Sequence, residues 1–589
     1  MLRSHTLGEL RKDHSGSAVT LCGWVHRRRD HGGLIFIDLR DRYGFTQVVF
    51  DPEDCAKEIF TIAETVRPEW VLKVEGVVRP RIESAVRDDH PTGAIEVLIS
   101  SVTVLNESKT PPFEIDVEKT VGEETRLEYR YLDLRRPRMQ RNILMRHKLL
   151  QAVRKYFYDR DFVEVETPIL IKGTPEGARE YLVPSRVHHG EFYVLPQSPQ
   201  QLKQLTMIAG LDRYMQIARC FRDEDQRGDR QPEFTQVDVE MSFVQAEDVM
   251  EITEDALITI TKALRSDVQI KEAPFPHLTY DQAMHTYGSD KPDLRYDLPF
   301  TDVTELCRGC GFSIFAGAVE HGSLVKALCV RGGALYSRKD IDELTEIAKV
   351  YGAKGLAWIK VTDSGFDGVP VPKLGDELTR KIAEKTHAAK GDIILFAADA
   401  FRTACESLGA VRIEIARRQN LIDPKLWSFV WITDFPMFEK DKETGELAAM
   451  HHPFTRPNKD SLDLLKTNPL EAKAEAYDVA LNGYEIAGGS VRIHEQNLQK
   501  LIFDILGVTD KEAERRFGHM LRAFEFGAPP HGGIAWGFDR LTMIFCDEPN
   551  IREVIAYPKD QKAKDLMLGA PTPIPEKQLK ELGVQVTKE

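Results

Sequence analysis

The sequence predicts a multidomain α+β protein, and three features carry that prediction. The length of 589 residues suggests roughly three or four domains. Residues 1–106 look all-β, with short runs of β-branched and aromatic residues between turn residues. Later segments mix helical and strand patterns, and a polar hairpin at Tyr214–Met241 resembles a site built on a sheet.

The composition is that of an ordinary globular protein, with 42% hydrophobic and 29% charged residues. No apolar run reaches the about 18 residues of a membrane span, and the first residues lack a secretory apolar core. Among eight cysteines only Cys307 and Cys310 form a C-x-x-C pair, and no second pair completes a zinc site. We therefore expect reduced thiols, a cytoplasmic location and no membrane association.

The net charge, 79 − 93 = −14, argues against non-specific binding of nucleic acid. Two basic islands stand out against this acidic background, at His26–Arg29 and at Arg126–Arg141. Such islands are often solvated surface, but they also suit a protein that selects one nucleic acid and releases it.

The N-terminal β-rich segment predicts an OB-fold barrel, whose second and third strands form a face for single-stranded nucleic acid. Its expected strands are Val19–Trp24, Leu34–Leu39, Thr46–Phe50, Trp70–Val78 and Ile95–Val104. The basic run precedes the second strand, which carries Phe36. An aromatic side chain beside arginines suits stacking on an unpaired base, although the alternation of residues leaves a core position for Phe36 open.

The hairpin at Tyr214–Met241 contains two strands joined by the charged loop Asp223–Pro232. One parity of the second strand carries Phe234, Gln236, Asp238 and Glu240, so an aromatic ring, an amide and two carboxylates share a sheet face. Arg222 ends the first strand, where its planar donors suit a phosphate. A solvated surface hairpin is an equally good interpretation of this stretch alone.

A second glycine-rich stretch, Gly527–Ile544, contains a Gly-Pro turn, a short apolar run and the helix start Gly537-Phe538-Asp539-Arg540. Glycines let a backbone approach a ligand closely, and an arginine at such a junction can reach a phosphate. Taken alone, this stretch is better explained by an ordinary glycine-rich turn before a core helix.

Together these stretches resemble motifs 2 and 3 of class II aminoacyl-tRNA synthetases, and Phe162–Leu170 with Pro168 resembles motif 1. Longer segments resemble bacterial-type aspartyl-tRNA synthetases in the family's order. They are TPEGAREYLVPSR (174–186), LPQSPQQLKQL (195–205), YGSDKPDLR (287–295), MHHPFT (450–455) and NGYEIAGGSVRIH (482–494). The resemblance covers essentially the whole chain.

The resemblance implies an antiparallel-sheet catalytic domain and six segments. They are an anticodon-binding barrel (1–106), a hinge that touches tRNA (107–140), a first catalytic part (141–287), a bacterial-type α/β insertion (288–424), a second catalytic part (425–560) and a C-terminal extension (561–589). In the family, the helix at Ile143–Tyr158 and the motif 1 strand build a homodimer interface, so we expect a homodimer. Within the insertion we expect helices at Asp340–Val350 and Leu378–Thr386 and strands at Gly355–Val361 and Asp392–Phe396.

The implied reaction joins L-aspartate to tRNA(Asp) through an aspartyl-adenylate, with ATP and Mg²⁺. The resemblance assigns catalytic roles to Arg222, Glu224 and Arg540. The ATP contacts are Arg222, Asp223, Glu224, Gln231, Phe234, Glu485, Gly537, Phe538, Asp539 and Arg540, with adenine between Phe234 and Arg540. The magnesium carboxylates are Asp478 and Glu485, although residues 474–485 also match the end of an amphipathic helix.

Aspartate would be bound by charges at its two ends. Lys203 and Arg492 match the family's cations for the side-chain carboxylate. The remaining positions that match the aspartate pocket are Glu176, Ser198, Gln200, Arg222, Asp238 and His451, with His452 as the alternative histidine. Two cations would leave one charge unneutralised if asparagine bound, and a buried unpaired charge is costly.

The anticodon contacts implied for the barrel are Arg29, His31, Phe36 and Gln47. Family members that serve only tRNA(Asp) can carry leucine at the position of His31, whereas histidine is associated with enzymes that also charge tRNA(Asn). The sequence therefore favours an enzyme that accepts both tRNAs.

Three other functions are compatible with parts of the sequence. Asparaginyl- and lysyl-tRNA synthetases share the architecture, but the pair Lys203 and Arg492 favours an acidic substrate. A paralogue that only binds nucleic acid would not need Arg222, Glu224, Glu485 and Arg540. A tRNA-independent asparagine-forming enzyme would not need the N-terminal barrel.

Overall fold

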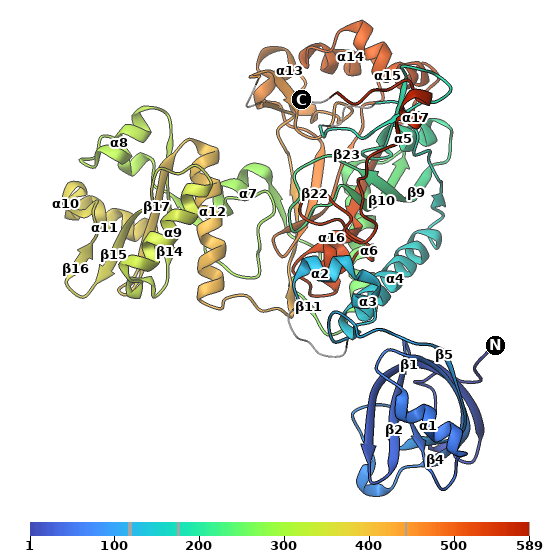
Figure 1. The fold of residues 1–589 in the computed structure, drawn as a ribbon. Helices are drawn as coiled ribbons and strands as arrows, with labels where there is room; N and C mark the ends of the chain where they lie inside the picture. The colour runs from blue at the N-terminus through green and yellow to red at the C-terminus, as the bar shows by residue number, and fades with distance from the viewer. Residues whose placement is uncertain (116–120, 174–176, 442–443, 588–589) are drawn as a thin grey trace. The chain divides into compact units, whose positions relative to one another are not determined.

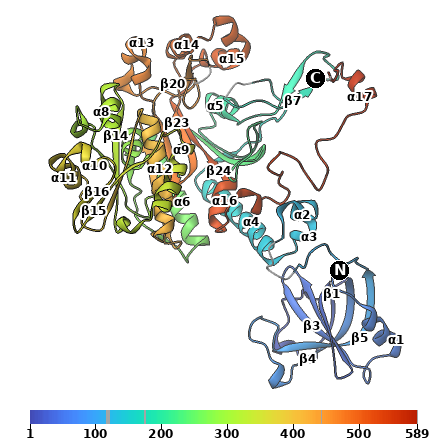
Figure 2. The same ribbon diagram turned by 60° about the vertical axis from the view of Figure 1, so that its left-hand side comes forward.

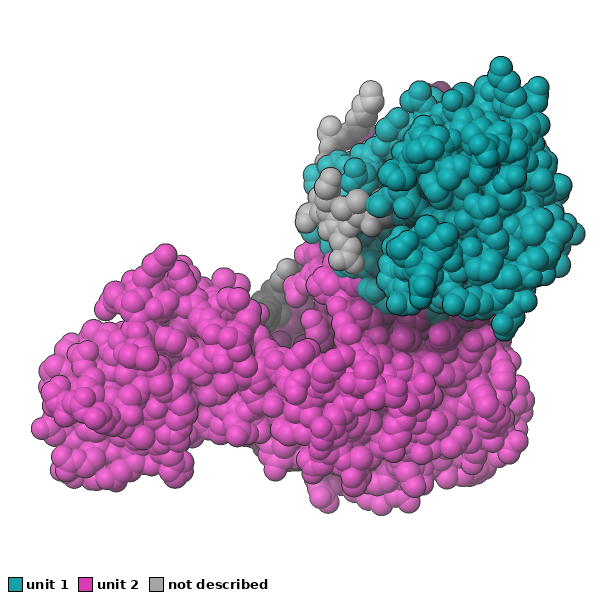
Figure 3. Space-filling view, turned by 90° about the horizontal axis from the view of Figure 1, so that it is seen from below, with its two compact units in different colours: residues 1–144, 552–572 teal, residues 145–551, 573–589 magenta. Residues whose placement is uncertain are grey.

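The computed structural model describes residues 1–115, 121–173, 177–441 and 444–587. They form two compact units, shown in two colours in Figure 3: residues 1–144 with 552–572, and residues 145–551 with 573–589. No helix in these ranges is both long enough and apolar enough to span a bilayer. The six-segment division predicted above stays a prediction, and the two units cut across it at residues 552–572.

The first unit contains a closed barrel of strand order β1-β2-β3-β5-β4 (Figures 1 and 2). The strands are β1 (Ala18–His31), β2 (Leu34–Asp41), β3 (Gly44–Phe50), β4 (Val71–Pro80) and β5 (Ile95–Asn106), with helix α1 (Lys57–Thr65) between β3 and β4. Alternate residues of β2, such as Ile35 and Ile37, fill the barrel interior. The basic run His26–Arg29 precedes β2, as predicted, but it lies inside β1, because β1 extends beyond the expected Trp24 to a turn at Gly32 and Gly33, both with positive φ.

Three helices follow the barrel: α2 (Glu123–Glu128), α3 (Arg130–Asp133) and α4 (Pro137–Tyr158). Arg126 and Arg130 are buried and pair with Asp133, at 3.0 and 2.7 Å, and Arg126 also pairs with Glu553 at 2.6 Å. These two arginines of the basic island therefore hold the first unit together. That the hinge 107–140 touches tRNA stays a prediction, and it rests on residues other than Arg126 and Arg130, whose guanidinium groups pair with buried carboxylates.

The second unit is built on an eight-stranded sheet of order β12-β19-β22-β23-β24-β10-β9-β6, antiparallel except at its two edge pairs. Its strands are β6 (Val163–Glu164), β9 (Arg213–Phe221), β10 (Glu233–Ser242), β12 (His277–Thr279), β19 (Phe429–Thr433), β22 (Ala476–Leu481), β23 (Tyr484–Val491) and β24 (His531–Gly537).

One face of this sheet is apolar and the other is polar, as alternate residues of β10 show. Val237 and Val239 join the main hydrophobic core with residues of α4, α6 (Ala246–Leu264) and α16 (Phe538–Phe545). The opposite parity faces α5 (Gln200–Ile208), whose Lys203 contacts Asp238 and Glu240. The polar face predicted for the hairpin is therefore confirmed as one side of the central sheet.

The structure shortens one strand expected in this sheet and excludes one alternative that the sequence left open. The motif 1 segment forms only the two-residue strand β6, because it pairs with β9 just at Val163 and Glu164 before Thr167-Pro168, and a proline cannot donate to a ladder. The stretch 474–485 is not the end of a helix; it forms β22 and the turn into β23. The helix predicted at the motif 3 junction is confirmed, and Gly532 and Gly533 lie within β24.

The insertion contains a separate antiparallel sheet of order β13-β14-β17-β15-β16. Its strands are β13 (Phe300–Asp302), β14 (Leu324–Val330), β15 (Ala357–Thr362), β16 (Gly365–Asp367) and β17 (Ile393–Asp399). Its helices are α8 (Ser313–Glu320), α9 (Arg338–Val350), α10 (Val371–Leu374), α11 (Asp376–Lys385) and α12 (Phe401–Arg418), after α7 (Tyr280–Tyr287). The four elements predicted here are all present, with small shifts of their ends.

The remaining elements are peripheral to these sheets. They are β7 (Leu182–Pro184), β8 (Phe192–Val194), β11 (Gln269–Ile270), β18 (Leu426–Trp427), β20 (Phe438–Lys440), β21 (Leu447–Ala449), α13 (Leu464–Thr467), α14 (Gln496–Ile505), α15 (Asp510–Phe524) and α17 (Glu576–Glu581).

Candidate active site

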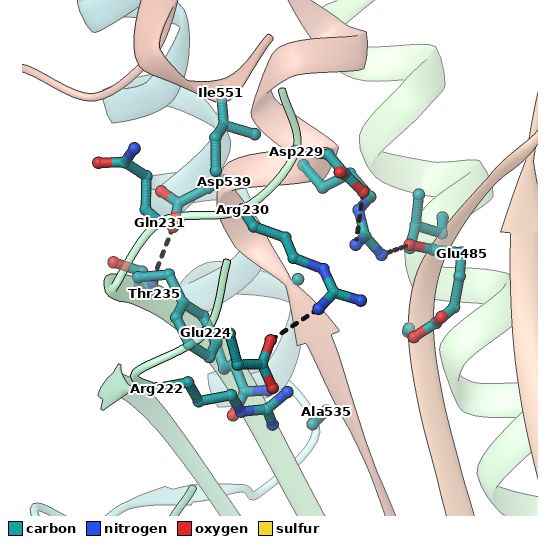
Figure 4. Close-up of a pocket in the computed structure, with 16 residues that line it drawn as sticks. Arg222, Glu224, Asp229, Arg230, Gln231, Thr235, Glu485, Ala535, Asp539 and Ile551 are labelled. Carbon is teal, nitrogen blue, oxygen red and sulfur yellow. Dashed lines mark hydrogen bonds and ion pairs between the residues drawn. The ribbon is translucent and has the colours of Figure 1, made fainter. Parts of the chain in front are cut away.

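Two cavities lie on the polar face of the central sheet. The first, of about 220 Å³, lies between the β9–β10 hairpin, β23 and the start of α16 (Figure 4). The second, of about 400 Å³, lies beside α5, β22 and the loop that contains His451. Four residues line both cavities, namely Arg222, Gln236, Glu485 and Ala535, so the two cavities meet at Arg222.

Charged side chains in the first cavity are paired with one another (Figure 4). Glu224 accepts from Arg230 at 2.7 Å, and Arg540 pairs with Asp229 at 3.0 Å while donating to the carbonyl of Glu485. The Arg222 guanidinium lies over the Phe234 ring, 5.2 Å from its centroid. A ring and a cation at this spacing can hold a planar group and an anion side by side.

Not every residue predicted for ATP lines this cavity. Phe538 is buried in the hydrophobic core, and Asp223 is exposed and outside the cavity lining. Asp539 reaches the lining, but its carboxylate accepts from the backbone N–H of Thr235 at 2.7 Å and from Arg146 at 2.5 Å. The side chains of Phe538 and Asp539 therefore fix α16 against the sheet. Gln231 and Gly537 do line the cavity.

The second cavity ends in a buried cluster of four charges. Lys203 Nζ lies 3.0 Å from Asp238 Oδ1 and 3.3 Å from Glu240 Oε2, and Arg492 Nε donates to Glu240 Oε1 at 2.9 Å. Lys203 is 1% exposed and Glu240 is fully buried. Two cations thus face two carboxylates, so the formal charges of the cluster cancel.

The sequence predicts two unpaired cations for the substrate carboxylate, at Lys203 and Arg492. In the structure, Asp238 and Glu240 already balance both cations. Burial alone would raise the pKa of Glu240, yet Arg492 and Lys203 outweigh burial and lower this pKa to about 2. Glu240 shares its strand face with Asp238, so the parity of β10 was the signal that could have assigned it to the site.

A second group of titratable residues lies on the other side of the second cavity. His451 Nε2 is 3.5 Å from Asp478 Oδ1, and Glu485 and Asp290 line the same cavity. Burial raises the pKa of Asp478 to about 6; the neighbouring His451 opposes this rise, and the charges of Glu485 and Asp290 add to it. His452 instead accepts from Arg492 at 2.8 Å, and burial together with Arg492 holds the pKa of His452 well below its usual value.

Several buried polar atoms at these cavities have no hydrogen-bond partner among the described residues. They are Arg222 Nε and Arg540 Nε in the first cavity and Gln200 Nε2, Asp238 Oδ2, His451 Nδ1 and Asp478 Oδ1 in the second. A buried polar atom without a partner costs about 1–3 kcal/mol. These atoms converge on two connected cavities, which indicates that a polar, charged ligand completes them.

Of the other residues predicted to bind the substrate aspartate, some are described by the structure and one is not. Ser198 and Gln200 line the second cavity together with Lys203, Asp238 and Arg492. Glu176 lies outside the described residues. Sequence reasoning did not assign Asp229, Arg230 and Asp290 to the site; the first two lie in the charged loop 223–232, and the third lies in the segment 287–295 that carries the family resemblance.

The predicted anticodon residues gather on one face of the barrel in the first unit. Arg29 on β1 is opposite Phe36 on β2, and Asp38 on β2 is opposite Gln47 on β3. Arg29 donates to Asp38 at 3.1 Å and to Gln47 at 3.0 Å. Phe36 is partly exposed and lies outside the barrel core, so it does not occupy the core position that residue alternation had left open. His31 is exposed at the end of β1.

A closed barrel in one unit and a mainly antiparallel sheet with two connected polar cavities in the other suit an enzyme with a separate oligonucleotide-binding module. The family described as "tRNA synthetases class II (D, K and N)" matches residues 122–561, and "OB-fold nucleic acid binding domain" matches residues 19–105. The chain therefore belongs to the class II aminoacyl-tRNA synthetases of the D, K and N group. Enzymes of this class use ATP as a substrate.

Curated relatives match along the whole chain. An Aspartate–tRNA(Asp/Asn) ligase of Rubrobacter xylanophilus is 52% identical over 99% of this chain and 97% of its own length. The enzyme of the same name from Bacillus subtilis is 50% identical over 100% of this chain and 99% of its own. An Aspartate–tRNA ligase of Macrococcus caseolyticus is also 50% identical, over 100% and 99%.

Solved structures share the fold at low sequence identity. The asparaginyl-tRNA synthetase of Pyrococcus horikoshii has a TM-score of 0.59 at 20% identity and covers 95% of this chain and 98% of its own. The aspartyl-tRNA synthetase of Entamoeba histolytica has a TM-score of 0.58 at 18% identity, with coverage of 94% and 91%. These similarities show the fold alone.

Proposed function

We propose that the protein attaches L-aspartate to tRNA(Asp), and also to tRNA(Asn), at the expense of ATP. The observation that carries this proposal is the buried cluster of Lys203, Arg492, Asp238 and Glu240 at the end of a cavity that meets a second cavity at Arg222. The names of the full-length relatives at about 50% identity support the same substrate.

In the first step, an oxygen of the α-carboxylate of aspartate attacks the α-phosphorus of ATP. The bond between the α- and β-phosphates breaks, pyrophosphate leaves and aspartyl-adenylate forms. Arg222 lines both cavities, so its guanidinium contacts the reacting carboxylate and the α-phosphate and stabilises the charge that builds there. Phe234 and Arg540 hold adenine between them, while Glu224 and Gln231 contact ATP.

In the second step, a ribose hydroxyl of the terminal adenosine of tRNA attacks the aspartyl carbonyl, and AMP leaves. Positioning and charge neutralisation suffice for both steps, so no protein nucleophile is required.

Asp478 and Glu485 would hold Mg²⁺. The residues fit this ion: Asp478 Oδ1 is buried and lacks a hydrogen bond, and Asp478, Glu485 and Asp290 gather negative charge that a cation would relieve. No group of three or more metal-binding side chains occurs within the described ranges. Two carboxylates are nevertheless enough for magnesium, which neutralises phosphate oxygens and keeps several waters.

Aspartate is selected through an exchange of ion pairs. The substrate's ammonium pairs with Asp238, which frees Lys203 to pair with the side-chain carboxylate, while Glu240 continues to balance Arg492. All charges are then compensated. Asparagine brings the ammonium without the side-chain carboxylate, so one buried positive charge would be left without a partner, at a cost of several kcal/mol. Ser198, Gln200 and His451 complete the pocket.

The barrel of the first unit binds the anticodon through Arg29, Phe36 and Gln47, and His31 decides tolerance for tRNA(Asn). The shared face of Arg29, Phe36 and Gln47 supports this, since an exposed ring beside an arginine suits base stacking. The protein acts in the cytoplasm as a homodimer.

The decisive experiment is aspartate charging of purified tRNA(Asp) and tRNA(Asn), side by side, with the parent and the variant His31→Leu. We expect the parent to charge both tRNAs and the variant to lose most activity on tRNA(Asn) alone. Charging of tRNA(Asp) alone by the parent would support the enzyme but remove His31 as a sufficient determinant. Failure on both tRNAs, with no aspartate-dependent pyrophosphate exchange, would favour a protein that only binds nucleic acid.

A further inference from the structure

The insertion contains a cavity that the proposed reaction does not use. It measures about 630 Å³ and lies between α8, the loop before β15, and β17. Small-molecule sites commonly enclose about 300–1,000 Å³ and combine apolar walls with a few polar groups. We call it the α8–β15 cavity.

Aromatic side chains make the floor of the α8–β15 cavity rigid. Phe315 and Phe396 belong to the insertion's hydrophobic core, with ring centroids 5.3 Å apart, and Phe312 packs edge-on against Phe315 at 4.8 Å. Their rings are fixed by packing below the cavity. The cavity is therefore already formed in the free protein, as small-molecule sites usually are.

The mouth of the cavity exposes apolar side chains to water. Ile314 is 59% exposed and Val369 is 62% exposed, and both line the cavity. Two glycines also line it, and a Cβ atom added to Gly317 or Gly355 would meet no atom within 4 Å. Larger side chains at these two positions would thus project into open space without a steric conflict.

The charges at the rim are mainly positive. Arg338 and Lys354 line the cavity, and Asp399 is the single carboxylate in the lining. Arg338 pairs only with Asp342, one turn along its own exposed helix, and Lys354 forms no ion pair with any described residue. An exposed pair of this kind holds its arginine weakly. The rim can therefore offer two cations to an incoming anion.

We propose that the α8–β15 cavity binds a small molecule with an aromatic or aliphatic body and an anionic group. The body lies on Phe315 and Phe396 and covers Ile314 and Val369, and the anion pairs with Lys354 and Arg338. This site is separate from the residues proposed for aspartate, ATP and tRNA, so the proposal does not depend on the aspartate reaction.

The test uses 8-anilinonaphthalene-1-sulfonate, a fluorescent aromatic anion, with the full-length protein. The parent is expected to bind the dye, and Gly317→Leu, which adds a bulky side chain to the cavity lining, is expected to lose most of the fluorescence. Gly355→Leu adds the same bulk to the cavity lining from the loop before β15 and guards against a folding defect in the first variant. Leu335→Ser is the matched control, because Leu335 is 91% exposed in the same domain and lies outside the cavity.

The charge preference is tested by displacing the dye with 4-phenylbutanoate and with 4-phenylbutylammonium, which share a body and differ in charge. The carboxylate is expected to displace the dye at several-fold lower concentration, and Lys354→Glu is expected to abolish that preference. Unchanged dye binding in both glycine variants would overturn the site, and equal displacement by the two probes would overturn its preference for anions.

Discussion

At the scale of single residues, loss of the Lys203 side chain should impair the use of aspartate far more than the binding of ATP. It contacts two buried carboxylates, so Lys203→Met leaves Asp238 and Glu240 with one cation. We expect kcat/KM for aspartate in pyrophosphate exchange to fall by roughly 100-fold or more, since breaking a buried pair costs about 3–5 kcal/mol. The KM for ATP should change far less.

The matched control for Lys203→Met is Lys326→Met. Lys326 is also a buried lysine in an ion pair, 3.2 Å from Asp302, but it lies in the insertion. Lys326→Met should lower the unfolding midpoint and leave both KM values near those of the parent. Equal losses for aspartate and ATP in Lys203→Met would contradict its role in selecting aspartate.

The ionised carboxylate of Glu240 should make the unfolding free energy of the second unit depend on pH in the acidic range. Its pKa is lowered to about 2, so it stabilises the folded state above its unfolded pKa of about 4.5, and this contribution is lost as the pH falls towards 2. Between these pH values the parent should lose roughly 3 kcal/mol of unfolding free energy that Glu240→Gln does not lose. Unfolding midpoints of parent and variant across this pH range measure the difference. Parallel curves would show that Glu240 is not held ionised by Arg492.

Sequence reasoning identified most of the residues that line the two cavities, and its errors at this scale have physical causes. Alternation along β10 gave the face of Phe234, Gln236 and Asp238 correctly, because strand parity depends only on backbone geometry. It did not predict that Glu240 neutralises Lys203, since ion pairing depends on which helix covers the strand. Phe538 adjoins a cavity-lining glycine in sequence, but the first turn of α16 directs its ring into the core.

At the scale of elements, Asp539 connects the start of α16 to β10. It accepts from the N–H of Thr235 and from Arg146, and Arg540 follows it directly. Asp539→Asn should lower the unfolding free energy by about 1–3 kcal/mol, because a buried charged hydrogen bond is lost. It should also raise the KM for ATP by displacing Arg540. Denaturant unfolding and pyrophosphate exchange at varied ATP measure the two effects.

Asp547→Asn provides the comparison for Asp539→Asn. Asp547 also pairs with an arginine, Arg265, at 3.0 Å, but its side chain is 63% exposed, so its loss should cost little. A normal KM for ATP in Asp539→Asn would argue that α16 keeps its place without this contact.

Helices and strands were predicted correctly where a regular hydrophobic pattern extends over many residues, and less well where the segment is short. The hairpin of β9 and β10 and the helices of the insertion have many residues of consistent pattern. The stretch around Asp478 was ambiguous because six residues of mixed polarity fit a strand and a helix end equally well, and pairing with β19 and β23 decided it. The motif 1 strand is short because its only partner is β9.

At the scale of the whole molecule, the proposed homodimer gives a use to apolar side chains that are exposed in one chain. Val163, Ile169 and Leu170 of the motif 1 segment are 45%, 43% and 52% exposed. Contiguous exposed apolar residues commonly mark protein interfaces. Since one chain has a mass of 66.9 kDa, light scattering should give about twice that value for the parent.

The double variant Ile169→Asp, Leu170→Asp should shift the protein to a mass near 66.9 kDa, because a carboxylate buried in an apolar interface without a partner costs several kcal/mol. Leu335→Asp, the same change at an exposed leucine in the insertion, should leave the mass of the dimer unchanged. A monomeric parent would overturn the proposed dimer. A double variant that keeps the parent's mass would instead move the interface away from the motif 1 segment, and the exposed residues there would need another explanation.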